Sequence, residues 1–88
     1  MKFIHTDLGM LNGGEIVEVT LSGSQANIKL MTSSNFQLYK SNRNHNCYVG
    51  LATKSPVKIP IPSAGHWHIT IDLGGYPGTI ESSIKIIR

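Results

Sequence analysis

Alternation of polar and apolar side chains along residues 66–73 marks the part of this chain best suited to chemistry. With the two-residue period of a β-strand, one face carries two imidazoles, a hydroxyl and a carboxylate, and the other face is apolar. The polar set is His66, His68, Thr70 and Asp72, and the apolar set is Trp67, Ile69, Ile71 and Leu73. Core packing explains only the apolar set. The polar row is therefore the first candidate for a binding site.

Two kinds of ligand suit the imidazoles of His66 and His68. As hydrogen-bond donors whose positive charge rises as the pH falls through about 6.5, they suit a phosphate group. A His-x-His pair is also a recurrent half-site for zinc or copper, but a third ligand would have to come from His5, His45 or Asp72 through folding. We expect a phosphate group rather than a metal, and no cofactor.

Basic and aromatic residues in the middle of the chain extend this predicted site. Between Glu18 and Asp72 there is no acidic residue and there are five basic ones, and the net charge of the whole chain is +3. Such a balance favours an anionic partner, although five cations over this length are too sparse for a nucleic-acid surface. We expect a small anionic molecule. The residues predicted to bind it are Arg43, His45, Tyr48, Lys54, His66 and His68.

Catalytic motifs are weak throughout the chain. Cys47 lies two residues from His45 in a polar loop, where a nucleophile and a base seldom have the required geometry, and no acid is near in sequence to orient the histidine. The glycine-rich segments 11–14 and 74–78 are not followed by Lys-Ser/Thr and a helix, as a phosphate-binding loop requires. We interpret both segments as turns and predict no catalytic residues.

A single domain covering residues 1–88 is the expected organisation, because compact domains have about 50 to 250 residues. A core of this size gives a thin margin of stability, so we expect a homo-oligomer. The single cysteine cannot form an internal disulfide, and the first residues do not resemble a signal peptide. No segment approaches the roughly 18 apolar residues of a membrane span, so we expect a cytoplasmic protein with no membrane partner.

Hydrophobic periodicity predicts β-strands along most of the chain. The alternating segments are 15–21, 26–31, 57–61, 66–73 and 80–87. The first two are close in sequence and are predicted to pair as a hairpin, and Pro60 places its segment at a sheet edge. Residues 33–40 break the period and predict one or two helical turns capped by Ser33 or Ser34. The fold class is therefore mainly β, a small antiparallel β-sandwich or barrel with one short helical turn.

Three motifs give the chain a family resemblance over almost its whole length. They are Ser-Ser-Asn-Phe at 33–36, Tyr-Val-Gly-Leu-Ala at 48–52 and Gly-His-Trp-His at 65–68. Together they resemble the bacterial family called domain of unknown function 1883. Its members occur as small stand-alone proteins and, in some architectures, fused to a TIR domain. Because that family has no established activity, the resemblance carries over no catalytic residue.

The TIR association implies a ligand class. Bacterial TIR domains cleave NAD and make cyclic ADP-ribose-type signals, so the resemblance implies a companion that binds such nucleotides as a sensor or as a sponge, including a sponge encoded by a phage. The sequence thus predicts a non-enzymatic module for a phosphate-containing nucleotide-type signal, ADP-ribose-like or a cyclic nucleotide, in antiviral defence or anti-defence. The alternative is a protein-interaction or oligomerisation domain without a small-molecule ligand, which would self-associate through the edge near Pro60.

Overall fold

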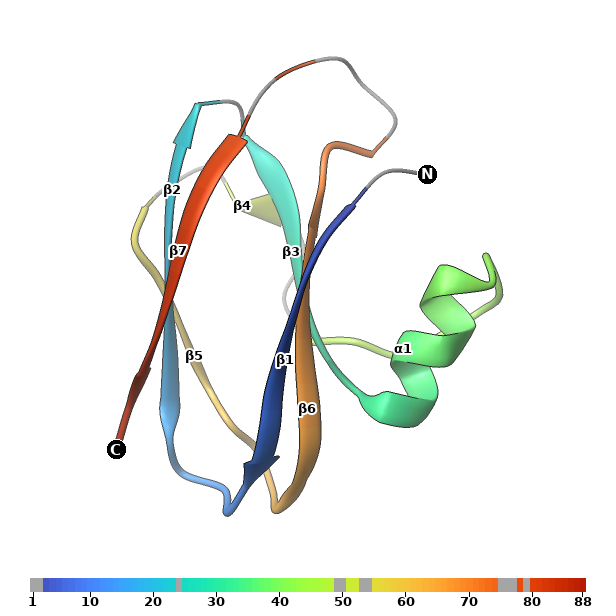
Figure 1. Cartoon of the computed structure of the whole chain (residues 1–88), viewed down its shortest axis with the longest axis vertical. Helices are drawn as coiled ribbons and strands as arrows, with labels where there is room; N and C mark the ends of the chain where they lie inside the picture. Colours follow the sequence, from blue (N-terminus) through green and yellow to red (C-terminus); the bar gives the residue numbers. More distant parts are fainter. Residues whose placement is uncertain (1–2, 24, 49–50, 53–54, 75–77, 79) are drawn as a thin grey trace.

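Two antiparallel β-sheets face each other, and a short helix lies against the outer face of one of them (Figure 1). The computed structural model describes residues 3–23, 25–48, 51–52, 55–74, 78 and 80–88. Its elements are β1 (Phe3–Leu11), β2 (Ile16–Gly23), β3 (Ala26–Thr32), α1 (Ser33–Lys40), β4 (Leu51–Ala52), β5 (Val57–Pro60), β6 (Gly65–Asp72) and β7 (Ile80–Ile87). The sheets have the orders β1-β6-β3-β4 and β5-β2-β7. The predicted fold class is confirmed, as a sandwich.

The main core fills the space between the sheets and follows the predicted strand period. Val17 and Val19 of β2 face it from one sheet, and alternate residues of β3 and β6 face it from the other. Trp67 is buried there, and its indole N–H donates a hydrogen bond of 3.0 Å to the carbonyl oxygen of Ser63. A buried indole needs such a partner, because an unpaired buried donor costs free energy. The prediction that Trp67 points inward is therefore confirmed.

The prediction that segments 15–21 and 26–31 form a hairpin is wrong. β2 pairs with β5 and β7, whereas β3 pairs with β4 and β6, so these consecutive strands belong to opposite sheets. Each strand has one apolar face, and that face points into the core whether the next strand lies beside it in the same sheet or opposite it in the other sheet. Local periodicity does not distinguish these two arrangements.

Strand β1 was not predicted, because its alternation is interrupted. The register of β1 with β6 shifts between Asp7 and Gly9, so that one extra residue, Leu8, lies in β1. Gly9 has a φ of +74°, a left-handed conformation that glycine adopts at no steric cost. The extra residue shifts the alternation of side chains by one position, so that odd-numbered side chains face the other side of the sheet after the bulge. The two-residue period of the sequence is therefore interrupted at this point.

Two other predictions about single elements can be compared with the structure. Within the described residues, β5 pairs only with β2 and forms a sheet edge, as Pro60 indicated. The helix at 33–40 is confirmed, but its N-cap residue is Thr32, which makes no side-chain capping hydrogen bond, rather than Ser33 or Ser34. Among the described residues, no helix is long and apolar enough to cross a membrane.

Helix α1 covers part of the polar row on β6 and forms a second, smaller core there. Phe36 and Tyr39 of α1 are buried against Met31 of β3, with Phe3 of β1 packed beside them. Figure 1 shows α1 on the side of the four-stranded sheet that faces away from the other sheet. The helix therefore gives this sheet two buried faces.

The carboxylate of Asp72 is held by hydrogen bonds beneath this helix. Tyr39 Oη donates to Asp72 Oδ2 at 2.6 Å, and Asn27 Nδ2 and the Gly74 N–H each donate to Oδ1 at 2.9 Å. Burial alone would raise the pKa of Asp72, but these hydrogen bonds and the charge of Lys29 hold it below its usual value. Asp72 thus attaches α1 to the sheet as an ionised group.

We predict that Tyr39→Phe lowers the free energy of unfolding by about 1.5–3 kcal/mol at pH 7, because it removes a hydrogen bond to a buried charged group. Since the pKa of Asp72 is depressed in the folded state, this contribution is present above about pH 4 and is lost as the pH falls through the folded pKa. Urea denaturation at neutral and acid pH measures both effects. Tyr48→Phe, at a half-exposed ring, is the matched control, and equal losses in both variants would contradict the assignment.

Candidate functional site

Strands β1 and β6 bring three histidines and an aspartate together on the outer face of the four-stranded sheet. The two strands are antiparallel neighbours, with Asp7 directly opposite His68 and His5 opposite Thr70. His66 lies two residues before His68 on the same face of β6. We call His5, Asp7, His66 and His68 the histidine–aspartate cluster.

The β-bulge in β1 positions the carboxylate of this cluster. The Gly9 N–H donates to Asp7 Oδ1 at 2.8 Å, and His66 Nε2 lies 2.6 Å from the same oxygen. Nothing lies within 4 Å of where a Cβ on Gly9 would be, so glycine is needed here for its backbone conformation rather than for space. The bulge therefore directs Asp7 toward His66, although the cross-strand partner of His66 is Met10.

His68 is the buried centre of the cluster, with only 6% of its surface exposed. Its Nδ1 is hydrogen-bonded to His5 Nε2 at 2.8 Å, and its Nε2 is hydrogen-bonded to Ser33 Oγ at 2.8 Å. Its ring stacks on those of His66 and Phe36, each at a centroid distance of 4.8 Å. Both ring nitrogens are paired and the ring is fixed in orientation.

The charges of the cluster favour a cation over an anion. Burial is the largest influence on His68 and lowers its pKa; the carboxylate of Asp7 opposes this, and the other two imidazoles add to it. The hydrogen bonds from His66 and from the Gly9 N–H lower the pKa of Asp7. At neutral pH the cluster thus contains a carboxylate beside an uncharged imidazole at its centre. A phosphate group placed here would be repelled by Asp7.

A recess of about 460 Å³ lies elsewhere, at the edge of the same sheet. We call it the Tyr48 recess, and its lining residues are Met31, Thr32, Asn35, Asn46, Cys47, Tyr48, Ser63 and Trp67. The half-exposed ring of Tyr48 packs edge-to-face on Trp67, with centroids 5.9 Å apart. Tyr48 and Leu30 exchange two backbone hydrogen bonds of 2.9 and 3.1 Å. The aromatic wall of the recess is therefore anchored to β3.

Hydrogen bonds also hold the polar wall of the recess. The Asn46 N–H donates to Asn35 Oδ1, and Asn35 Nδ2 donates to Thr32 Oγ1, both at 3.0 Å. These bonds connect the start of α1 with the loop before Tyr48. An amide has two donor hydrogens and two acceptor lone pairs, so Asn35 retains one of each for a ligand.

Of the six residues predicted from the sequence to bind one ligand, the five that the structure describes lie in different places. His66 and His68 are together in the cluster, whereas Tyr48 lines the recess. Arg43 is exposed in the loop after α1, where its carbonyl oxygen lies 3.0 Å from Nδ1 of His45, whose ring packs on Tyr39. Lys54 lies outside the described residues. Among the described residues, the structure thus brings the two histidines of the strand together, whereas Arg43, His45 and Tyr48 lie in other segments.

Sequence reasoning missed several residues that the structure places at these sites. It considered His5 only as a possible third metal ligand and did not consider Asp7. Both residues lie at alternate positions after Phe3 and therefore face the same side of the strand. It offered Asp72 as another third ligand, but that carboxylate is bonded to Tyr39 and Asn27. The amides and hydroxyls of the recess gave no signal, because they come from three separate segments.

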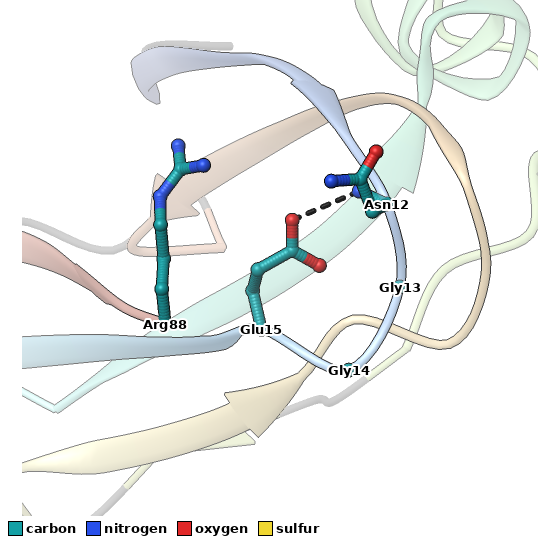
Figure 2. Close-up of a pocket in the computed structure, with 5 residues that line it drawn as sticks. All are labelled: Asn12, Gly13, Gly14, Glu15 and Arg88. Carbon is teal, nitrogen blue, oxygen red and sulfur yellow. Dashed lines mark hydrogen bonds between the residues drawn. The ribbon is translucent and has the colours of Figure 1, made fainter.

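A second recess, of about 340 Å³, lies at the turn between β1 and β2 (Figure 2). Figure 2 shows the carboxylate of Glu15 turned toward Asn12 across the glycine-rich turn, with Arg88 beside it. Glu15 Oε2 accepts the Asn12 N–H at 2.8 Å, and backbone N–H groups of the turn, that of Asn12 first, lower the pKa of Glu15. The carboxylate lies where a phosphate-binding loop would hold its ligand. This supports the interpretation of the segment as a turn.

Comparison with known proteins finds a family model and nothing more specific. The model described as "Domain of unknown function (DUF1883)" matches residues 1–88. No curated protein and no solved structure matches.

We predict that acid destabilises the protein through His68. The unfolded histidine protonates near pH 6.5, whereas the pKa of the folded side chain is lower, so full stability is present above about pH 6.5 and declines as the pH falls toward the folded pKa. Denaturation curves between pH 7.5 and 5, with a chelator present, measure this decline. His68→Gln should flatten it and His45→Gln should preserve it; an identical decline in the His68 variant would assign the effect to another group.

Proposed function

We propose that this chain, which belongs to the DUF1883 family of domains of unknown function, is a non-enzymatic module that binds a nucleotide-type small molecule in the Tyr48 recess. One observation carries the proposal: a concave site of about 460 Å³ combines two aromatic side chains with amides and hydroxyls. Small-molecule sites have volumes of about 300–1,000 Å³ and are lined by aromatic residues with a few polar groups that fix orientation. The recess meets that description.

Tyr48 is the residue proposed to stack on the base. Its ring is 52% exposed and is supported on one side by Trp67 and through its backbone by Leu30. An aromatic ring that is already fixed loses little conformational freedom when a base stacks on it. This pre-organisation supports a planar heterocycle as the ligand part that enters the recess.

The amides and hydroxyls around Tyr48 suit the edge of a base and a ribose. Asn35 keeps one donor and one acceptor after its internal hydrogen bonds, and an amide can pair with both kinds of atom on a base edge. The described lining residues include no lysine, arginine, histidine or carboxylate. The phosphate part is therefore proposed to extend out of the recess toward the basic loop that contains Arg43, and binding is proposed to occur without turnover.

The biological setting is part of this proposal. The TIR association that the resemblance implies supports an ADP-ribose-like molecule or a cyclic nucleotide as the proposed ligand, with the module acting as a sensor or a sponge in antiviral defence or anti-defence. The single cysteine supports a cytoplasmic location, where thiols stay reduced. His66 and His68, assigned to the same ligand from the sequence, do not support this site, because they pair with Asp7 and Ser33 instead.

Self-association is the second candidate function, and the edges of the three-stranded sheet favour it. In the described part of the chain, β5 and β7 each pair only with β2 and form its two edges. A sheet edge presents backbone donors and acceptors that a second copy can pair with. β7 has eight residues and no proline, so it offers a longer pairing edge than β5.

We predict that a thermal-melting screen of the full chain with AMP, ADP-ribose, NAD and cyclic AMP finds at least one ligand that stabilises it. The stabilisation follows RT ln(1 + [L]/Kd), about 2.7 kcal/mol at a hundredfold excess over Kd, and the ligand is recovered intact. Tyr48→Ala should weaken binding by about 1–3 kcal/mol, the usual value of a base stacked on an aromatic ring.

The matched control is Met10→Ala, which truncates another exposed apolar side chain, on β1. Equal binding in the wild type and in Tyr48→Ala would place the ligand elsewhere. If no ligand changes the melting temperature while sedimentation shows a concentration-dependent dimer, self-association replaces ligand binding as the function.

A further inference from the structure

The histidine–aspartate cluster brings together donor atoms of the kinds that hold transition metals. Asp7, His66 and His68 each offer one ligand atom, and these three atoms lie within 4.8 Å of one another. We propose that these three side chains bind a divalent transition-metal ion, with zinc as the first ion to test. Imidazole nitrogen with carboxylate oxygen is a common ligand set for zinc and for neighbouring first-row metals. The proposal is independent of the Tyr48 recess and goes beyond the proposed function.

Rotation of the Asp7 and His66 side chains is needed to bring the three donor atoms to bonding positions. With metal–ligand distances of about 2.0–2.1 Å in a tetrahedral site, ligand atoms are roughly 3.3 Å apart. The pair Asp7 Oδ1 and His66 Nε2, now 2.6 Å apart, would separate, and the widest pair would close. The side chains of Asp7 and His66 are 52% and 42% exposed, so solvent surrounds the groups that must move. The ring of His68 is buried, and the nitrogen that binds the metal must give up its present hydrogen bond to His5 or to Ser33.

Each nitrogen of His68 already has the partner that a metal-bound histidine needs. If Nε2 binds the metal, Nδ1 keeps its hydrogen bond to His5; if Nδ1 binds, Nε2 keeps its hydrogen bond to Ser33. Histidine ligands almost always donate their second ring N–H to such a group, which fixes the tautomer and the ring orientation. Whichever of His5 and Ser33 keeps its hydrogen bond to the metal-bound His68 is thus proposed as the positioning residue.

The surroundings of the cluster restrain the ligands before any metal binds. Phe36 stacks on the imidazoles of His68 and His5, at centroid distances of 4.8 and 4.1 Å. The ring of His66 also stacks on that of His68, with planes 10° apart, and because a metal binds in the plane of an imidazole, the His66 ring must turn out of this stack to share an ion with His68. The Gly9 N–H holds the carboxylate of Asp7 through the bulge. Three protein ligands leave at least one coordination position for water or for an exogenous ligand, and the exposed sides of Asp7 and His66 give it access.

The chain offers matched variants for a direct test. His45 is the one histidine of the sequence outside the cluster and lies in the loop after α1, where its Nδ1 is 3.0 Å from the Arg43 carbonyl oxygen. His45→Ala therefore removes an imidazole without touching the cluster. A Cys47→Ser background removes the single thiol, which would otherwise bind zinc by itself. His66→Ala and Asp7→Asn change half-exposed side chains, so the fold is expected to persist, and melting without metal checks this.

We predict that zinc titrated into the Cys47→Ser chain, in competition with a chromogenic chelator, binds saturably at one ion per chain. His66→Ala and Asp7→Asn should each weaken that binding by at least about tenfold, and His45→Ala should leave it unchanged. Cobalt(II) should give visible absorption bands that are lost in the same two variants. The proposal is overturned if the chain binds no zinc, if the two cluster variants bind as the parent does, or if only His45→Ala loses binding. Tyr48→Ala should bind zinc normally, so the two proposals can fail separately.

Discussion

Burial of strand β6 on both faces is the constraint on which the rest of this structure depends. Every residue from Trp67 to Asp72 is buried, although every second one is polar. The apolar face closes the main core, and polar groups on the other face need hydrogen-bond partners, because an unpaired buried polar group is costly. Tyr39 supplies a partner to Asp72 and Ser33 to His68. The position of α1 therefore follows from the polar row that it covers.

Helix α1 covers only part of the polar row on β6, so the row has a buried part and an exposed part. Asp72, at the end of β6 beneath Tyr39, is only 3% exposed and acts as an attachment point for α1. His68 is buried but lies beside two other imidazoles, and His66 is half exposed at the other end of the strand. His66 is thus the one residue of the row with a substantially exposed side chain. His66 is therefore the residue of the row most accessible from solvent, and Asp7 from β1 is hydrogen-bonded to it there.

The cluster and the recess share β6 and differ in charge and shape. Trp67 lies between His66 and His68 in the sequence, yet its side chain points to the opposite face and lines the recess. The cluster has nitrogen and carboxylate donors in an open position, which suits a cation, whereas the recess has uncharged polar and aromatic groups, which suit a planar organic molecule. One strand thus supplies residues to two sites because its alternate side chains face different environments.

Sequence alone determined the properties that depend on neighbouring residues. The parity of β6, the inward direction of Trp67, the helix at 33–40 and the edge position of β5 all follow from local alternation, its interruption, or a proline that lacks an N–H. Tertiary structure decided which strands pair. It placed β2 and β3 in opposite sheets, and it set β1 beside β6, which brought His5 and Asp7 to the histidines. Pairing depends on burial summed over residues far apart in the chain, and the bulge at Gly9 breaks the local period at the point where the cluster forms.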